Sequence, residues 1–317
     1  MRDKLYLVGF LLGAGLLLFL GRNLLQGSVL LSWSLTFGGT TTAAVLGLLL
    51  YRLQLQLKAS RHELARKEVE LKIARDVQEA LFPRQLPTGG GLEFSAVCIP
   101  SSGISGDYYD VLQLPDGRLI FAIADISGKG ISAAILMANL QAVLRVLAAS
   151  APEPSEVCRR LNQHLHEVTE ASKFATFFYA EWRAWEKKLT YVNAGHNAPL
   201  LLKNGHGQQL DQGGMPLGLF PSAVFRTGTV CLGSGDTLVL YSDGITEATS
   251  KNGEEFGELR LESVVRAHCG KPLAVIQQQV LASVRQWAGE NQEDDMTLLL
   301  VRATEQPRKC EGGQEEP

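Results

Sequence analysis

The sequence lacks the residue patterns of several binding and enzyme classes. Its 317 residues carry a net charge of only −3, and the absence of a basic excess argues against a nucleic-acid partner. The five cysteines are odd in number and no two have metal-ligand spacing, which favours reduced thiols over a disulfide framework or a zinc site. Apolar residues make up 45% of the chain, so a disordered chain is also excluded.

Charge is almost absent from the first fifty residues. Residues 5–21 are nearly all apolar, and residues 29–51 contain no charged side chain. A membrane helix needs about 20 such residues, so we predict a transmembrane hairpin, whose first span is the shorter and richer in glycine. Arg and Lys flank both outer ends and only Arg22 lies in the connector, which places both ends in the cytoplasm. A buried hairpin of a soluble protein is the alternative.

Residues 52–86 form a charged segment that predicts one long helix. No glycine or proline interrupts residues 52–81, and the prolines of LFPRQLP then end the helix. Leu57, Leu64 and Leu71 recur at the seven-residue spacing of a parallel coiled coil. Because the heptads are few, a single helix packed on the following domain is an equal alternative.

Residues 87–303 have the pattern of a globular α+β domain, and residues 304–317 form a polar tail predicted to be disordered. Strand-like runs cover 92–99, 118–124, 174–184, 189–192, 236–241 and 296–301, and helix-like runs cover 131–149, 155–170, 259–268 and 272–287. Most strands follow other strands and the helices come in pairs, which is not the alternating order of a doubly wound sheet. We therefore predict antiparallel sheets layered between helices.

Acidic residues stand at four places where a strand-like run ends or a turn begins. They are Asp107 in SGDYYD, Asp125 in IADISGKG, Asp243 in VLYSDG, and the pair Asp294 and Asp295 in EDDMT. Each alone is typical of a turn, but strand ends that converge would gather carboxylates whose repulsion a cation relieves. Oxygen ligands favour Mg²⁺ or Mn²⁺ over zinc. Two such ions, about 4 Å apart, can bind a phosphate and activate water.

The segment DISGKG suits a simple turn, a phosphate loop or a metal site. Its lysine follows a glycine, but the spacing is not GxxxxGK[ST], which excludes a nucleotide-binding P-loop. The chain also lacks GxSxG and CxxxxxR elements, so no nucleophilic serine or cysteine is predicted. Gly128 and Gly130 suit close backbone approach and the start of a helix at Ile131.

Six ordered motifs resemble those of SpoIIE-type phosphatases, most closely the RsbU-like stress-response enzymes of the metal-dependent (PPM) serine/threonine class. They are SGDYYDV, IADISGKGISAAILM, YVNAGHNAPLLL, GMPLG, LVLYSDGITEA and EDDMTLLLVR. The likeness covers about residues 73–302, including ARDVQEALFPRQLP before the domain. It implies a PPM-type antiparallel β-sandwich flanked by pairs of helices, with two Mn²⁺ or Mg²⁺ ions.

The resemblance also implies which residues bind metal. Asp107 would bind one ion, Asp125 would bridge both, and the backbone carbonyl of Ile126 would replace a glycine carbonyl of eukaryotic relatives. Asp243 would bind the other ion, and Asp294 would be the ligand from the DD pair. Catalysis would depend on Asp125 and Asp243, which would hold the ions for attack by a bridging water.

Further residues are candidates for outer-shell or substrate contacts: Asp110, Ser127, Lys129, His196 and Asp295. Ser127 stands where eukaryotic relatives carry a histidine thought to protonate the leaving group, so the acid is unassigned here. His196 in NAGHNAP is either catalytic or held by the hydrogen bonds of its turn. Lys129 either contacts substrate phosphate or is only solvated.

The resemblance implies a protein serine/threonine phosphatase, and the two apolar segments predict that it is membrane-anchored. Its substrate would be a phosphorylated anti-anti-sigma (STAS) protein of a partner-switching pathway, and its catalytic domain would lie on the cytoplasmic side of the bacterial inner membrane, beside lipid. With no sensor module between residues 51 and 81, homodimerisation of the linker helix would control activity. A catalytically silent scaffold that binds the phosphoprotein is the alternative, disfavoured by the complete aspartate set, and hydrolysis of small phosphate esters is a third hypothesis.

Overall fold

The computed structural model describes residues 13–17, 19, 21, 29–101, 103–169, 173–203, 205–289 and 292–304. The chain divides into two compact units, Met1–Glu70 and Leu71–Pro317. The predicted tail lies outside the described residues apart from Thr304. The catalytic motifs all fall in the second unit, which therefore contains the candidate site.

The N-terminal segments differ from the predicted transmembrane hairpin. Most of the first predicted span, 5–21, lies outside the described residues, whereas the second, 29–51, is helical and begins α2 (Val29–Glu79). α2 continues without a break through residues 52–79 of the predicted linker and ends at Glu79, before the linker's predicted end at residue 86. Within the described part of the chain, one helix is long and apolar enough to cross a membrane, α3 (Ile131–Ser150). Its Met137, Leu140 and Leu144 belong to a buried core, so two transmembrane helices are not shown.

Two sheets form the centre of the second unit. The strands are β1 (Leu92–Ile99), β2 (Tyr108–Gln113), β3 (Leu119–Ile126), β4 (Ala175–Arg183), β5 (Lys188–Ala194), β6 (Leu200–Lys203), β7 (His206–Gln209), β8 (Gly213–Gly214), β9 (Gly228–Cys231), β10 (Thr237–Tyr241) and β11 (Met296–Ala303). One sheet has the order β1-β11-β10-β6-β7, and the other has β2-β3-β4-β5-β8 with β9 also paired to β5. The ladders are antiparallel except for the short β5–β8 pair. This confirms the predicted antiparallel sheets.

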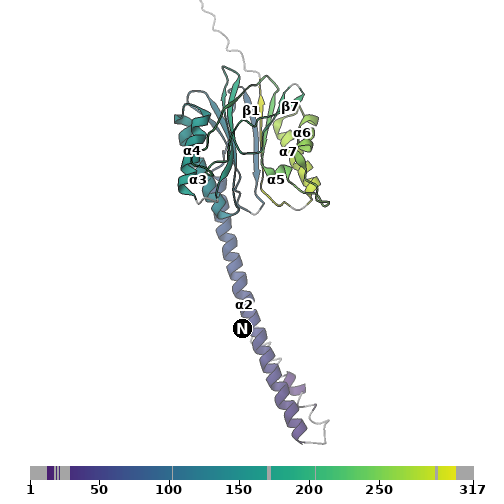
Figure 1. Cartoon of the computed structure of the whole chain (residues 1–317). Coiled ribbons are helices and arrows are strands. Elements are labelled where there is room, and N and C mark those ends of the chain that lie inside the picture. The colour runs from purple at the N-terminus through teal and green to yellow at the C-terminus, as the bar shows by residue number, and fades with distance from the viewer. Residues whose placement is uncertain are drawn as a thin grey trace, which may run out of the picture. The chain divides into compact units, whose positions relative to one another are not determined.

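Pairs of helices cover the outer faces of both sheets. The remaining helices are α4 (Pro154–Val168), α5 (Asp243–Thr246), α6 (Gly257–Ala267) and α7 (Leu273–Ala288). Figure 1 shows α3 and α4 over one sheet and α6 and α7 over the other, so the layers run helix, sheet, sheet, helix. The expected sandwich between helix pairs is therefore present.

The side chains of β3 alternate between two cores. Leu119, Phe121 and Ile123 pack between the sheets, whereas the alternate residues Ile120 and Ala122 pack under α3 and α4. A period of two is the geometry of a strand, and burial on both faces explains why this strand is apolar throughout. β10 behaves in the same way, with its other face under α6 and α7. Both central strands are thus buried on both faces; β3 carries Asp125 next to its last residue, and β10 ends two residues before Asp243.

Candidate metal centre

Strand register brings the acidic positions to one end of the sandwich. The start of β2 pairs with the end of β3, which places Asp107 beside Asp125. In the other sheet the end of β10 pairs with the start of β11, which places Asp243 beside Asp294 and Asp295. Antiparallel pairing necessarily joins the end of one strand to the start of its neighbour. The sequence motifs therefore converge although they lie far apart along the chain.

Asp295 ties the two sheets together at this end. Its Oδ2 accepts hydrogen bonds from Ser105 Oγ at 2.7 Å and from the Gly106 amide at 2.9 Å. Its Oδ1 accepts one from the Ser101 amide at 2.7 Å. Three donors from the segment before β2 thus occupy this carboxylate. The neighbouring Asp294 has a side chain that is 46% exposed; its Oδ1 accepts a hydrogen bond from the Asp295 amide at 2.9 Å, and it is the more accessible member of the pair.

The pKa values show that negative charge is crowded here. Burial, followed by the charges of Asp243 and Asp294, raises the pKa of Asp125 to about 7. Burial and the charge of Asp294 raise the pKa of Asp243, and burial and the charge of Asp125 raise the pKa of Asp107 well above its usual range. Lys129 opposes the shifts at Asp125 and Asp243. Each carboxylate therefore penalises ionisation of the others, which a bound cation would relieve.

The donor set fits a hard cation in its chemistry. Oδ2 of Asp107 is buried and makes no hydrogen bond of normal geometry, although the nearby Thr297 and Ser242 hydroxyls lower the pKa of this carboxyl. Such an oxygen is costly to bury as an anion unless a cation satisfies it. In the part of the chain that the structure describes, no group of three or more His, Cys, Asp or Glu side chains is arranged as a preformed metal site. The carboxylates supply oxygens and negative charge of the kind that a hard cation binds.

Glycines permit the close backbone approaches around this site. A Cβ at Gly106 would lie 3.1 Å from the carbonyl oxygen of Ile126, and a Cβ at Gly244 would lie 2.1 Å from the carbonyl oxygen of Asp295. A side chain at Gly106 would crowd the end of β3 beside β2, and one at Gly244 would clash with the segment that enters β11 beside β10. The carbonyl of Ile126 thus lies against the segment that leads to Asp107, as a backbone ligand would have to.

Ser127 and Lys129 occupy different environments within the same loop. Ser127 Oγ accepts a hydrogen bond of 2.9 Å from the Phe174 amide, and the Ser127 amide donates one of 2.9 Å to the Phe174 carbonyl. Ser127 therefore closes the end of the β3–β4 pair. Lys129 Nζ lies 2.9 Å from Asp294 Oδ2 and 3.1 Å from the Glu293 carbonyl oxygen. It is a largely exposed cation at the edge of the acidic residues.

Asp110 is not brought into the acidic set. Its Oδ2 accepts hydrogen bonds from Tyr108 Oη at 2.7 Å and from Arg145 Nε at 2.8 Å, and Arg145 also contacts Oδ1 at 3.2 Å. The carboxylate is 1% exposed, and this ion pair holds α3 against β2. Arg145 is the only charged residue of the apolar α3, and that was the sequence signal for a buried partner.

His196 lies in a turn that is held by its own hydrogen bonds. Asn193 accepts a bond from the His196 amide at 2.8 Å and donates one to its carbonyl at 3.0 Å. The imidazole Nδ1 lies 2.8 Å from Thr176 Oγ1, and Thr176 pairs with Asp125 across β3 and β4. Burial lowers the pKa of His196 to about 4, so the ring is neutral near pH 7. This geometry favours a structural role behind Asp125 over a catalytic one.

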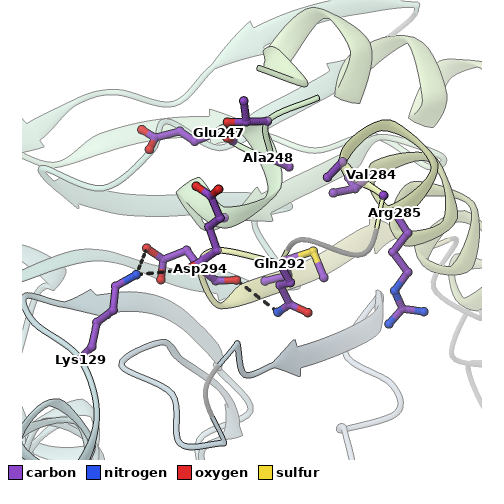
Figure 2. Close-up of a pocket in the computed structure, with 13 residues that line it drawn as sticks. Lys129, Glu247, Ala248, Val284, Arg285, Gln292 and Asp294 are labelled. Carbon is purple, nitrogen blue, oxygen red and sulfur yellow. Dashed lines mark hydrogen bonds and ion pairs between the residues drawn. The ribbon is translucent and has the colours of Figure 1, made fainter. Parts of the chain in front are cut away.

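A pocket of about 480 Å³ opens beside Asp294. Apolar and charged side chains share its wall, among them Ala248, Val284, Ala288, Met296, Lys129, Glu247, Arg285 and Glu293. Figure 2 shows Lys129 pointing to Asp294, with Arg285 on the opposite side of the pocket.

Sequence reasoning missed the pocket residue Glu247. Burial and the charges of Asp243, Glu255 and Asp294 raise its pKa, so its carboxylate belongs electrostatically to the acidic set. Its spacing of four residues from Asp243, one helical turn, was the available signal.

Comparison with known proteins gives one family. Residues 115–304 match the family of stage II sporulation protein E (SpoIIE). Phosphoserine phosphatase RsbU of Bacillus subtilis (strain 168) is 30% identical over 236 residues, which cover 74% of this chain and 70% of RsbU.

Two solved structures share the fold. The SiaA-PP2C domain of Pseudomonas aeruginosa superposes with a TM-score of 0.67 at 22% identity, covering 75% of this chain and 98% of that domain. RsbX in complex with magnesium superposes with a TM-score of 0.52 at 19% identity, covering 69% of this chain and 99% of RsbX. At these identities the two structures establish the α+β sandwich.

Proposed function

The chain belongs to the SpoIIE family of PP2C-type serine/threonine phosphatases, and we propose that it removes phosphate from phosphoserine or phosphothreonine of a STAS-type regulatory protein in a partner-switching pathway. The observation that carries the proposal is the convergence of Asp107, Asp125, Asp243 and Asp294 at one end of the sandwich. All four acids are present, whereas a catalytically silent relative would be expected to lack at least one of them.

We assign two Mn²⁺ or Mg²⁺ ions to this site. Asp125 would lie between them, Asp107 would hold one, and Asp243 with Asp294 would hold the other. The buried Oδ2 of Asp107, which makes no hydrogen bond of normal geometry, and the raised pKa of Asp125 support the assignment, and the carbonyl of Ile126 is the backbone candidate. When bound, the ions supply positive charge that neutralises phosphate oxygens and lowers the pKa of nearby water.

The remaining residues position the substrate. Lys129 is exposed beside Asp294, and we propose that its ammonium group contacts the substrate phosphate. The pocket next to Asp294 would receive the peptide segment around the phosphorylated residue, since its wall offers apolar surface and charges of both signs.

Hydrolysis forms a bond from water oxygen to phosphorus and breaks the bond from phosphorus to the seryl oxygen. A proton must then reach the seryl oxygen. Ser127 Oγ already accepts a hydrogen bond inside the fold and the imidazole of His196 is buried and neutral. We therefore propose that a water molecule, and neither of these side chains, donates the proton to the seryl oxygen.

We further propose that the apolar N-terminal part of the chain anchors it in the bacterial inner membrane, with the phosphatase domain in the cytoplasm. Along α2, Val45, Leu48 and Leu49 are each more than half exposed. A helix with such a surface requires a cover, and lipid is a suitable one. The full chain should resist carbonate extraction from membranes. Deletion of residues 1–51 should abolish that resistance.

The linker part of α2 is proposed to form a homodimer. Leu57 and Leu64 are each more than half exposed and Leu71 is 39% exposed, and their seven-residue spacing suits a parallel coiled coil. Light scattering of the full chain in detergent should give the dimer mass. Leu57→Glu with Leu64→Glu should return the monomer mass.

The central test is release of phosphate from a purified phosphorylated STAS protein by the full-length chain in detergent with Mn²⁺. Wild type should release phosphate, whereas Asp125→Asn and wild type in chelator should not. Asp116→Asn, which changes an exposed acid in the turn before β3, should behave as wild type. Binding of the phosphoprotein without phosphate release would indicate a scaffold, and release from small esters alone would exclude a protein substrate. Equal activity of Asp125→Asn and wild type would overturn the proposal.

A further inference from the structure

The C-terminal turn of α2 is bonded to the segment that carries Asp107. Gln78 is 5% exposed, and its side-chain amide makes two hydrogen bonds with a single residue. Nε2 donates to the Ser105 carbonyl at 2.7 Å, and Oε1 accepts from the Ser105 amide at 2.9 Å. Because one planar group holds both the donor and the acceptor of Ser105, it restricts the orientation of that residue as well as its position.

Ser105 connects this contact to two acids of the site. Its Oγ donates to Asp295 Oδ2 at 2.7 Å and accepts a hydrogen bond of 3.0 Å from the Asp107 amide. Ser105 is 0% and Asp107 is 2% exposed, so no water replaces these bonds. The hydrogen bonds therefore connect Gln78 to the Asp107 amide through one intervening residue.

The end of α2 does not depend on Gln78 for its attachment. Gln141 of α3 donates from Nε2 to the Leu81 carbonyl at 3.0 Å, and Arg75 donates from Nε to the Gly103 carbonyl at 2.5 Å. Loss of the Gln78 amide would thus leave this segment docked and remove the two bonds to the Ser105 backbone. The two hydrogen bonds of Gln78 therefore position the segment that carries Ser105, whereas the helix end is docked mainly by other contacts.

The sequence position of Gln78 is also unusual. It follows Leu57, Leu64 and Leu71 at the same seven-residue interval, where a coiled-coil series would call for another apolar residue. A polar side chain that is buried at such a position is costly unless its hydrogen bonds are satisfied. Here the amide donates one hydrogen bond and accepts one, both with Ser105.

We propose that Gln78 is a positioning residue for the cation-binding carboxylates, acting on Asp107 through Ser105. The inference rests on the proposed function, since it assumes that Asp107 and Asp125 share the bound cations. Residues that orient metal ligands commonly change metal affinity by about 10- to 100-fold when they are replaced. The amide of Gln78 would hold Asp107 within reach of the ion that Asp125 also binds.

The test is Mn²⁺ titration of the full-length chain by calorimetry in detergent, without substrate. Gln78→Met keeps the length of the side chain and removes both hydrogen bonds, and we expect the Mn²⁺ dissociation constant to rise about tenfold. The matched control is Gln141→Met, which removes a buried amide of α3 that bonds the Leu81 carbonyl just after α2 and does not contact the Ser105 segment. Its dissociation constant should stay within about twofold of wild type.

Ser105→Ala supplies a second variant, which keeps both backbone bonds to Gln78 and breaks the linkage at its next step, the bonds of Ser105 Oγ; unchanged Mn²⁺ affinity in this variant would also overturn the inference. Ser105→Ala should weaken Mn²⁺ binding, and the double variant should bind no more weakly than the weaker single one, because both changes act on one linkage. The inference would be overturned if Gln78→Met bound Mn²⁺ as tightly as wild type, or if Gln141→Met lost as much Mn²⁺ affinity as Gln78→Met. It would also be overturned if the two single losses of affinity added in the double variant. If wild type binds Mn²⁺ and Asp125→Asn does not, the proposed function survives such a failure; if wild type binds none, both fail.

Discussion

Ser105 Oγ lies 2.7 Å from Asp295 Oδ2, and this bond distinguishes two adjacent aspartates. Asp295 is 8% exposed and joins the start of β11 to the segment before β2. Asp294 instead faces the pocket, where its Oδ2 contacts Lys129. One member of the pair holds the sheets together, and the other is available to a cation.

Replacement of each aspartate should therefore have a different effect. Asp295→Ala removes an acceptor from three donors and should lower the free energy of unfolding by about 2–4 kcal/mol, since buried donors are left unpaired. Asp294→Ala should change it by less than about 0.5 kcal/mol but should weaken Mn²⁺ binding. Urea unfolding of the metal-free chain and calorimetric titration measure the two effects. The opposite assignment of effects would contradict this division.

Removal of the guanidinium from the Asp110–Arg145 pair should destabilise the fold without changing metal affinity. Arg145→Met leaves a buried carboxylate with Tyr108 as its remaining side-chain partner. The free energy of unfolding should fall by about 2–4 kcal/mol, which is less than for a fully buried ion pair because Arg145 is partly exposed. Asp110→Asn with Arg145→Met should recover part of that loss. Weaker Mn²⁺ binding by Asp110→Asn would instead support an outer-shell role for Asp110.

His196 should make stability fall in mild acid. Burial lowers its pKa from 6.5 to about 4, so between these values the unfolded chain binds the proton and the folded chain does not. The stabilisation is complete above pH 6.5 and is lost as pH falls toward 4, by about 3 kcal/mol in all. Urea midpoints at pH 7.5 and 5.0 should differ less for His196→Gln than for wild type. His206→Gln, at an exposed position, should keep the wild-type difference.

Asp125 should have the opposite pH dependence in chelator. Its pKa is raised to about 7, so the folded chain retains a proton that the unfolded chain has released. Stability from this group is complete below pH 3.8 and is lost as pH rises through 7. Asp125→Asn should therefore stabilise the metal-free chain at pH 8 by about 2–4 kcal/mol and should have little effect near pH 4. A loss of stability at pH 8 would show that the acids are not crowded.

Lys129→Gln should raise the KM for the phosphorylated protein several-fold, with a smaller change in kcat, because an exposed ammonium contributes mainly to binding of phosphate. Mn²⁺ affinity should be equal or higher, since a competing positive charge is removed from Asp294. Lys251→Gln changes an exposed lysine elsewhere and is the control. An unchanged KM for Lys129→Gln would show that this lysine is only solvated and does not contact the substrate phosphate.

The helices and central strands were predictable because their patterns are local. The predicted strand at 92–99 coincides with β1, and the predicted helices at 131–149 and 272–287 lie within one residue of α3 and α7. Strands buried on both faces need continuous apolar runs, which are visible in the sequence. β2 was missed because Asp110 interrupts its apolar pattern, and the short strands β6 to β9 lie among glycines and polar residues.

The sequence by itself determined the layer order and which acidic residues stand at strand ends. A carboxylate directly after or before a buried strand has a defined place in an antiparallel sheet. Only the tertiary structure decided their individual roles. The donor that occupies Asp295 lies 190 residues away, and the cation that pairs with Asp110 lies 35 residues away. Gln78 acquired its importance in the same manner, from a contact 27 residues away. Periodicity reports which face of an element is buried, whereas the partner of a buried polar group depends on how distant segments pack.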